Sequence, residues 1–300
     1  MYDIVILTEK RYLKPTKKNW YINQVLEEDS ILFEEIKKLG LKVGRKDWND
    51  ENFIWNNTKL AIFRSTWDYF DKITEFTSWI KSNKSKTTFL NSYELIKWNI
   101  NKSYLNELKE NNINIAKTKF INKDNFITLK ELFHKTKFKV AVIKPSISGA
   151  AKNTFKINLN NYLEHENLFK NLIFNENSEM IFQEFLYSIY KNGEISLIVI
   201  NGQFTHAIKK IAKKGDFRVQ DDHGGKVINH IATKQEIEFA ETCIKKCPFK
   251  PIYSRVDIIY DNNNEISLSE LELIEPELWF RKNRKSARKL AKAIKNNLFF

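Results

Sequence analysis

Apolar and polar positions in the first third of the chain alternate between short hydrophobic runs and one long amphipathic stretch. Residues 4–7 and 60–63 are apolar runs, residues 22–39 carry apolar side chains at helical spacing up to Gly40, and residues 41–43 are again strand-like. Strands and a helix in this order form βαβ units, which place parallel strands in one sheet. We therefore predict an α/β region over residues 1–95 with a small parallel sheet.

The remaining two thirds mix helical stretches with strands that follow one another directly. Residues 95–108 and 234–246 have helical spacing, and residues 140–145 form an apolar strand. Two hairpins are expected, one around Asn201 and Gly202 and one whose strands, residues 255–260 and 268–275, flank a polar turn. These elements follow the first region in the chain.

Composition and charge narrow the class of protein. The 300 residues are 42% hydrophobic and 13% aromatic, as in a globular protein. The formal net charge of +13 raises the question of nucleic-acid binding, but lysine is scattered along the whole chain. The one basic concentration, residues 281–295, has apolar positions at helical spacing, which favours an amphipathic helix with a solvated basic face over an RNA-binding helix.

The N-terminal residues, the lengths of the apolar runs and the cysteines lead us to expect a cytoplasmic protein. The charged N-terminus does not resemble a signal peptide, and no apolar run approaches membrane-spanning length. Cys243 and Cys247 are four residues apart in a predicted helix, without a further cysteine or histidine cluster, so we expect reduced thiols.

Acidic side chains occupy the second hairpin at positions where paired strands would otherwise carry apolar ones. Glu270 and Glu272 point to the same face because strand side chains alternate, and the hairpin brings Asp257 alongside them. Hard carboxylate oxygens suit Mg²⁺ or Mn²⁺, which are typically held by a few carboxylates together with substrate phosphates. The alternative is an acidic hairpin edge that faces solvent.

Two further segments have the chemistry of a phosphate site and of a substrate site. Lys144 ends a strand and precedes small residues that include Ser148 and Gly149, whose backbone N–H groups could hold an anion; the alternative is an ordinary turn. Residues 64–69 follow another strand at the edge where α/β sheets bind ligands. There Arg64 could meet a substrate carboxylate and Asp68 an amine, or the aromatic side chains could pack on the core.

Taken together in chain order, these segments resemble the ATP-grasp ligase superfamily, most closely its glutathione-synthetase-like branch and the group that contains the D-cycloserine cyclo-ligase. The resemblance spans nearly the whole chain, including residues 64–69, 215–220 and 270–276. It implies an α+β, two-lobed ATP-grasp domain at residues 96–300, with a lid lobe at about residues 115–186, behind the N-terminal α/β substrate-side domain at residues 1–95.

The resemblance also implies a role for each candidate residue. Nucleotide phosphates would contact Lys102 and Lys144 under a flap that contains Ser148 and Gly149. The adenine would meet Gln183, Glu184, Phe185 and Leu186, and the ribose would meet Glu194. Arg218, with Arg255 as a weaker candidate, would lie near the transferred phosphoryl group, and Mg²⁺ would bind Asp257, Glu270 and Glu272. The substrate side would comprise Arg64, Ser65, Thr66, Trp67, Asp68 and Glu275.

These expectations define an ATP- and Mg²⁺-dependent enzyme that forms a carbon–nitrogen bond through an acyl phosphate. Its cofactors would be ATP and Mg²⁺ or Mn²⁺, and its partners would be small amino-acid-like substrates, without a membrane and without nucleic acid. A homo-oligomer stays open. Two alternative functions also stay open: a non-catalytic ATP-binding sensor, and a ligase that modifies a protein or peptide terminus.

Overall fold

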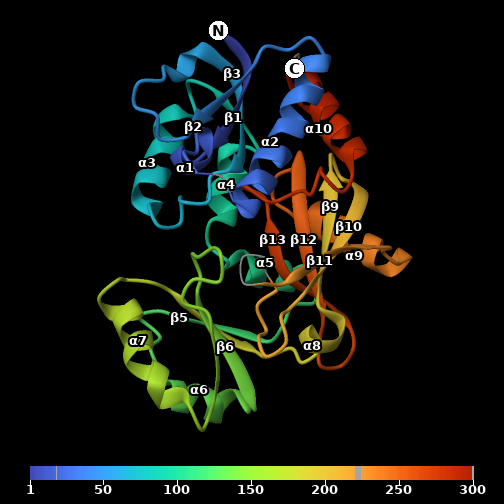
Figure 1. Cartoon of the computed structure of the whole chain (residues 1–300). Helices are drawn as coiled ribbons and strands as arrows, with labels where there is room; N and C mark the ends of the chain where they lie inside the picture. Colours follow the sequence, from blue (N-terminus) through green and yellow to red (C-terminus); the bar gives the residue numbers. More distant parts are fainter. Residues whose placement is uncertain (18, 220–223, 299–300) are drawn as a thin grey trace.

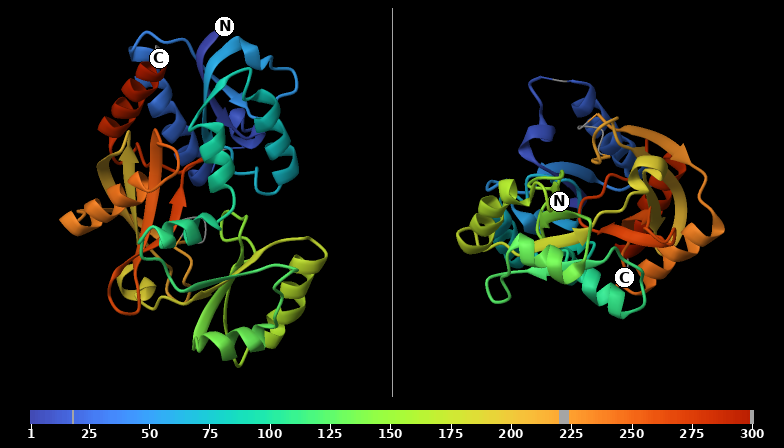
Figure 2. Two further views of the ribbon diagram at one scale, coloured as in Figure 1. Left: turned by 180° about the vertical axis from the view of Figure 1, so that it is seen from behind. Right: turned by 90° about the horizontal axis from the view of Figure 1, so that it is seen from below.

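The computed structural model describes residues 1–17, 19–219 and 224–298, and within them it contains three β-sheets (Figure 1). A sheet formed by the N-terminal region lies at one end of the molecule. An antiparallel sheet lies in the middle, and a smaller sheet forms a separate lobe at the other end, as Figure 2 shows from behind. The predicted combination of α/β and α+β architecture is confirmed.

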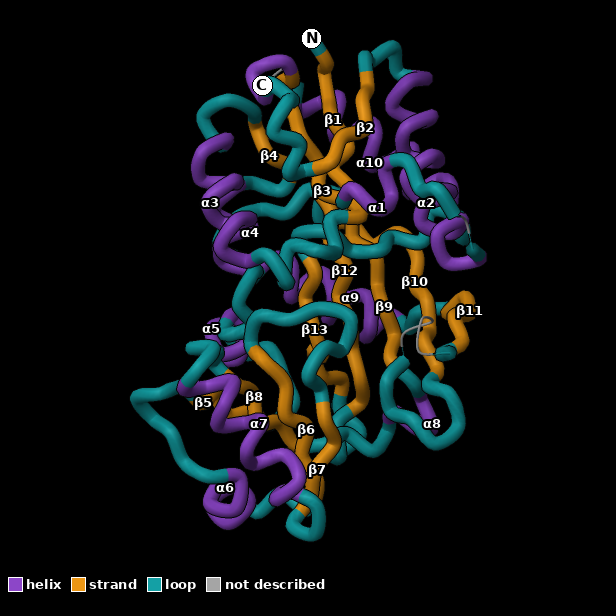
Figure 3. Tube along the Cα trace, turned by 60° about the vertical axis from the view of Figure 1, so that its left-hand side comes forward, coloured by secondary structure: helices purple, strands orange, loops and turns teal. Residues whose placement is uncertain are grey.

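The N-terminal sheet is four-stranded and parallel, as predicted. Its order is β2-β1-β3-β4, with β1 (Tyr2–Thr8), β2 (Val43–Asp47), β3 (Thr58–Ser65) and β4 (Thr88–Leu90). Alternate residues of β1 face opposite sides: Ile4 and Ile6 pack toward α2 (Trp20–Lys38), whereas Val5 and Leu7 pack toward α3 (Ile73–Asn83). The two helices lie on opposite sides of the sheet in Figure 3.

The central sheet is five-stranded and antiparallel, and it contains both predicted hairpins. Its order is β11-β10-β9-β12-β13, with β9 (Glu194–Ile200), β10 (Gln203–Ile211), β11 (Lys226–His230), β12 (Tyr253–Tyr260) and β13 (Ile266–Glu272). The helix α9 (Lys234–Lys245) begins with a capping box at Thr233 and packs against this sheet. The second hairpin strand ends at Glu272 rather than at Glu275.

The separate lobe contains a four-stranded sheet and two covering helices. Its order is β5-β8-β6-β7, with β5 (Thr118–Ile121), β6 (Val140–Pro145), β7 (Phe155–Asn158) and β8 (Met180–Glu184). The helices α6 (Leu129–Thr136) and α7 (Tyr162–Phe174) bury Phe133 and Phe169 against it. Outside this lobe, single-turn helices are formed by α1 (Lys10–Leu13), η1 (Trp55–Asn57) and α8 (Ile189–Asn192).

The single helix predicted at residues 95–108 is wrong, because the chain forms two helices there. α4 (Tyr93–Asn99) and α5 (Tyr104–Glu110) are separated by a turn in which the side chain of Asn101 accepts a hydrogen bond from Ser103 N at 2.8 Å. An asparagine that bonds to the backbone two residues on competes with the helix. The interruption leaves the backbone N–H of Lys102 free to donate to Ser146 O at 2.9 Å.

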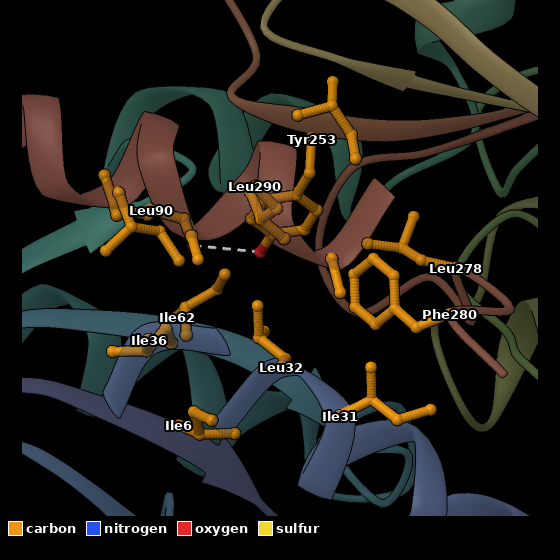
Figure 4. Close-up of a cluster of buried hydrophobic side chains, with 14 of the residues drawn as sticks. Ile6, Ile31, Leu32, Ile36, Ile62, Leu90, Tyr253, Leu278, Phe280 and Leu290 are labelled. Atoms are coloured by element: carbon orange, nitrogen blue, oxygen red, sulfur yellow. Dashed lines mark hydrogen bonds between the residues drawn. The ribbon is translucent and has the colours of Figure 1, made fainter. Parts of the chain in front are cut away.

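The basic C-terminal segment forms the predicted amphipathic helix, α10 (Arg284–Asn297), and it returns to the N-terminal region. Its fully buried Leu290 joins Leu32 of α2 and Ile62 of β3 in one core cluster (Figure 4). The hydroxyl oxygen of Tyr253 lies 2.9 Å from Leu90 O and so extends that cluster to β4. α10 therefore packs the C-terminal segment against α2 and the N-terminal sheet. No helix in the described ranges is both long and apolar enough to cross a membrane.

Candidate active site

A large cavity lies where the three sheets approach one another. Its volume is about 1010 Å³, and its walls come from loops that follow β1 and β3, from the separate lobe and from the central sheet. Nearly all the residues that the sequence singled out line it. They are Trp67, Asp68, Lys102, Lys144, Ser148, Gly149, Gln183, Glu184, Phe185, Leu186, Glu194, Arg218, Arg255, Asp257, Glu270, Glu272 and Glu275.

The β12–β13 hairpin places the acidic residues opposite one another. Asp257 pairs in register with Glu270, and Arg255 pairs with Glu272. Because residues two apart on a strand share a face, all four side chains project from the same face of the sheet toward the cavity. The register shifts directly after Asp257, where the hairpin is irregular.

Cationic side chains neutralise these carboxylates. Lys102 Nζ lies 3.1 Å from Glu270 Oε1, and Lys210 Nζ lies 3.0 Å from Asp257 Oδ2. The guanidinium of Arg255 donates to both oxygens of Asp257 at 2.8–3.1 Å and also binds Glu272. Burial by itself would raise the pKa of Asp257, but Arg255 and Lys210 hold that pKa well below its ordinary value.

Lys210 is a member of the site that the sequence reasoning missed. Its ammonium, 6% exposed, binds Glu194 as well as Asp257. In the β9–β10 hairpin Lys210 stands opposite Glu194, but only because the register shifts between Phe204 and His206. Counting back from the Asn201–Gly202 turn without that irregularity would pair Lys210 with Gly193. The signal in the sequence that could have identified it was the position of this lysine among the apolar residues of a hairpin strand.

Lys144 has no such partner. It lies at the end of β6 and lines the cavity, and burial lowers the pKa of its ammonium group. Among the cationic side chains that line the cavity in the described part of the chain, only Lys144 lacks both a hydrogen bond and an ion pair. A partly buried cation without a counterion is a ready site for an anionic ligand.

The loop after β6 closes over Lys102. Lys102 Nζ donates to Ser148 O at 2.7 Å, so the loop and the lysine are joined directly. Gly149 lies against the ring of Phe70, and a Cβ atom at this position would overlap that ring. The predicted flap therefore contacts the N-terminal region in this conformation.

The predicted adenine and ribose residues also line the cavity. The backbone N–H groups of Glu184 and Phe185 already donate to Lys117 O at 2.8 Å and Val140 O at 3.1 Å. A purine would therefore have to use other groups of this segment. Glu194 accepts a hydrogen bond from Ser269 Oγ at 3.1 Å in addition to its ion pair with Lys210.

Arg218 also lines the cavity. Its guanidinium lies 2.7 Å from the carboxylate of Asp216, and that arginine holds the pKa of Asp216 below its ordinary value. The run in which it stands, residues 215–220, ends at a residue outside the described part of the chain.

Three of the expected substrate residues do not line the cavity. The guanidinium of Arg64, 2% exposed, donates to Pro276 O at 2.8 Å and lies 3.8 Å from Glu28. Ser65 Oγ donates to Asp29 Oδ2 at 2.8 Å, and the Thr66 side chain is fully buried. The structure thus directs Arg64 toward the backbone of residue 276 and not into the cavity, so the expectation that it meets a substrate carboxylate there is wrong.

The acidic face has the donor chemistry of a Mg²⁺ site. Asp257, Glu270 and Glu272 offer only carboxylate oxygens, which are the hard ligands that Mg²⁺ prefers. In the described ranges no three histidine, cysteine, aspartate or glutamate side chains are drawn together as a complete metal cage. Mg²⁺ does not require one, since it usually takes one or two carboxylates plus substrate phosphates. The residues fit a metal that arrives with a nucleotide.

Comparisons with known proteins show which family and fold this chain resembles. Residues 4–91 match the family model for the N-terminal domain of the D-cycloserine synthetase DcsG, and residues 107–270 match that for the prokaryotic glutathione synthetase ATP-grasp domain. The cycloserine biosynthesis protein DcsG of Streptomyces lavendulae is 22% identical over 280 residues, which cover 89% of this chain and 92% of that protein.

Two solved structures show the same overall arrangement. The crystal structure of D-cycloserine synthetase DcsG superimposes with a TM-score of 0.85 at 18% identity, covering 98% of this chain and 99% of that one. D-alanine–D-alanine ligase from Bacillus anthracis superimposes with a TM-score of 0.69 at 14% identity, covering 100% of this chain and 98% of that one. At these identities the likeness concerns the fold.

Proposed function

This chain belongs to the prokaryotic glutathione synthetase ATP-grasp family, whose members join a carboxylate to an amine with ATP, and we propose that it ligates small amino-acid-type substrates through an acyl phosphate. The observation that carries the proposal is the convergence of Lys102, Lys144, Asp257 and Glu270 on one cavity. These residues are far apart in the sequence and come from three different parts of the fold. ATP and Mg²⁺ are the cofactors that their charges suit.

The first step transfers the γ-phosphoryl group of ATP to a substrate carboxylate, so that a P–O bond to ADP breaks and a new P–O bond forms. Phosphoryl transfer depends mainly on alignment and on neutralising the phosphate oxygens. Lys144, which has no other counterion in the described structure, is suited to bind those oxygens, and Lys102 and Arg218 line the same cavity. When bound, Mg²⁺ would neutralise further phosphate charge from the face of Asp257, Glu270 and Glu272.

The second step joins the two substrates. The amine nitrogen attacks the carbonyl carbon of the acyl phosphate, a C–N bond forms, and the C–O bond breaks. Phosphate leaves with the electron pair of that bond, and the nitrogen releases its proton. Because an acyl phosphate hydrolyses in water, the flap at Ser148 and Gly149 has to keep the cavity closed during this step.

The experiment is a screen of amino acids, singly and in pairs, for ADP release that requires Mg²⁺. We expect at least one carboxylate to stimulate ADP release and EDTA to abolish it. Tight ATP binding without stimulation by any amino acid would favour the non-catalytic sensor. Stimulation by peptides but not by free amino acids would favour the ligase of a peptide terminus.

A further inference from the structure

The acidic side chains that line the cavity are almost all paired with a cation. Each of them except Glu275 has a lysine or arginine partner within 4 Å in the described structure. The pairs are Glu9–Arg11, Asp68–Lys72, Asp71–Lys152, Glu184–Lys117, Glu194–Lys210, Asp257–Lys210, Glu270–Lys102, Glu272–Arg255 and Glu277–Arg281. Glu275 therefore differs from every other carboxylate of the cavity.

Glu275 is the acidic counterpart of Lys144. Among the described residues that line the cavity, Lys144 is the basic side chain without an ion-pair partner and Glu275 is the acidic one. Burial raises the pKa of the Glu275 carboxyl to about 8, and a bound cation would favour its charged form. Unpaired charges in a largely buried site are costly unless a ligand supplies the missing partner. A bound anion, which the proposed function identifies as phosphate, would neutralise Lys144. A bound cation would neutralise Glu275.

The backbone that carries Glu275 is held in place by three side chains, of which Tyr253 and Arg64 are buried and Trp67 is half-buried. Tyr253 Oη donates to Ile274 O at 2.7 Å, Trp67 Nε1 donates to Glu275 O at 3.0 Å, and Arg64 Nη1 donates to Pro276 O at 2.8 Å. Consecutive carbonyls at residues 274–276 are thus each fixed by a donor from another part of the chain. A carboxylate on such a segment is preorganised, as a binding group needs to be.

The surroundings of Glu275 favour an organic cation over a metal ion. Glu275 lies beyond the end of β13, and the aromatic residues Trp67 and Tyr69 line the cavity with it. Burial, and after it the nearby charge of Glu275, raises the pKa of Tyr69. A carboxylate beside aromatic rings is a common setting for an ammonium group.

We propose that Glu275 binds the ammonium group of the amine substrate and that Arg64, Trp67 and Tyr253 position it by fixing the backbone of residues 274–276. This inference rests on the proposed function and adds to it the class of the second substrate, a primary amine that enters as a cation. It also gives the run at residues 64–67 a role in substrate binding that does not require Arg64 to reach the cavity.

The test compares wild type with Glu275→Gln, using the carboxylate and amine found in the amino-acid screen. We expect the KM for the amine to rise roughly 10- to 100-fold, because a charge-assisted hydrogen bond is lost. The KM for ATP and the Mg²⁺ requirement should stay within about twofold of wild type. Hydroxylamine, which carries no charge near neutral pH, should still trap the acyl phosphate as a hydroxamate in the variant.

Two further variants distinguish the loss of ammonium binding from a general structural effect of the substitution. Glu275→Asp keeps the charge and should recover part of the amine affinity. Asp71→Asn removes the same charge from a cavity side chain that is 49% exposed and paired with Lys152, and it should leave the amine KM within about twofold. Thermal unfolding of each variant checks that it is folded.

The outcomes separate this inference from the proposed function. No ADP release by wild type with any carboxylate would end the proposed function itself. Active wild type with an unchanged amine KM in Glu275→Gln would overturn the role of Glu275 and leave the ligase intact. An increased Mg²⁺ requirement without a change in amine KM, or loss of hydroxamate formation, would overturn it as well.

Discussion

Lys210 Nζ lies 3.0 Å from Asp257 Oδ2, and the same ammonium group binds Glu194, so one buried lysine neutralises carboxylates from two different strands. Replacing it by methionine would leave two buried carboxylates with less compensation. We expect Lys210→Met to lower the free energy of unfolding by about 3 kcal/mol in the absence of ligands.

Urea unfolding checks this expectation, with Lys209→Met as the matched control on the opposite face of β10. The control should change stability by no more than about 0.5 kcal/mol. If the two variants were equally stable, Lys210 would not be the counterion of Asp257 and Glu194.

Replacing Lys144 should lower activity without lowering stability. Lys144→Met removes the unpaired cation that faces the phosphate site, and we expect turnover to fall by at least roughly 100-fold. The protein should be as stable as wild type or more stable, because burial disfavours the charged lysine. Steady-state ADP release and thermal unfolding measure the two effects.

The control for Lys144 is Lys139→Met, which alters an exposed lysine at the residue before β6. It should retain wild-type turnover. Full activity in Lys144→Met would remove Lys144 from the phosphate site.

Substitutions at Gly149 and Phe70 are expected to have coupled effects on kcat/KM. A methyl group at residue 149 overlaps the ring of Phe70, so Gly149→Ala should displace the flap and lower kcat/KM roughly 10- to 100-fold. Phe70→Leu in the same chain should restore a large part of that loss. A double-mutant cycle on kcat/KM measures the coupling, and strictly additive effects would show that the flap does not close against Phe70.

Trp67 should affect the amine substrate although its role is to hold the backbone. Trp67→Phe removes the indole N–H that donates to Glu275 O, and we expect the amine KM to rise about 3- to 10-fold. The KM for ATP should not change. Trp20→Phe, at a tryptophan that is 61% exposed, serves as the control. Equal effects of the two variants on the amine KM would contradict the positioning role.

The buried His206 should make the free energy of unfolding depend on pH. Burial lowers its pKa from the ordinary value of 6.5 to about 4. The folded state therefore binds this proton less readily than the unfolded chain, so stability present above pH 6.5 is lost as the pH falls toward 4. His206 should account for up to about 3 kcal/mol of the difference between pH 7 and pH 4.

Urea unfolding across this pH range in His206→Leu provides the measurement. The variant should lose less stability on acidification than wild type. His134→Leu, at an exposed histidine, should follow the wild-type curve. An unchanged pH dependence in His206→Leu would show that another group is responsible.

The sequence by itself determined the elements and most of the charged groups of the site. Strand alternation placed Glu270 and Glu272 on one face, and the hairpin brought Asp257 alongside them, although its direct pairing with Glu270 depends on the irregular register after Asp257. The parallel sheet and the amphipathic C-terminal helix also followed from local periodicity. These features depend on neighbours within a few residues or across one turn, so the order of residues is enough to fix them.

The tertiary structure decided which charges face one another and which stay unpaired. Lys210 reaches Asp257 because β9 lies between β10 and β12, and it faces Glu194 because the β9–β10 hairpin has an irregular register. Arg64 turns to Pro276 O because the segment after β13 passes beside the end of β3. Contacts between residues more than 200 positions apart depend on how the sheets pack, and no local pattern encodes that packing.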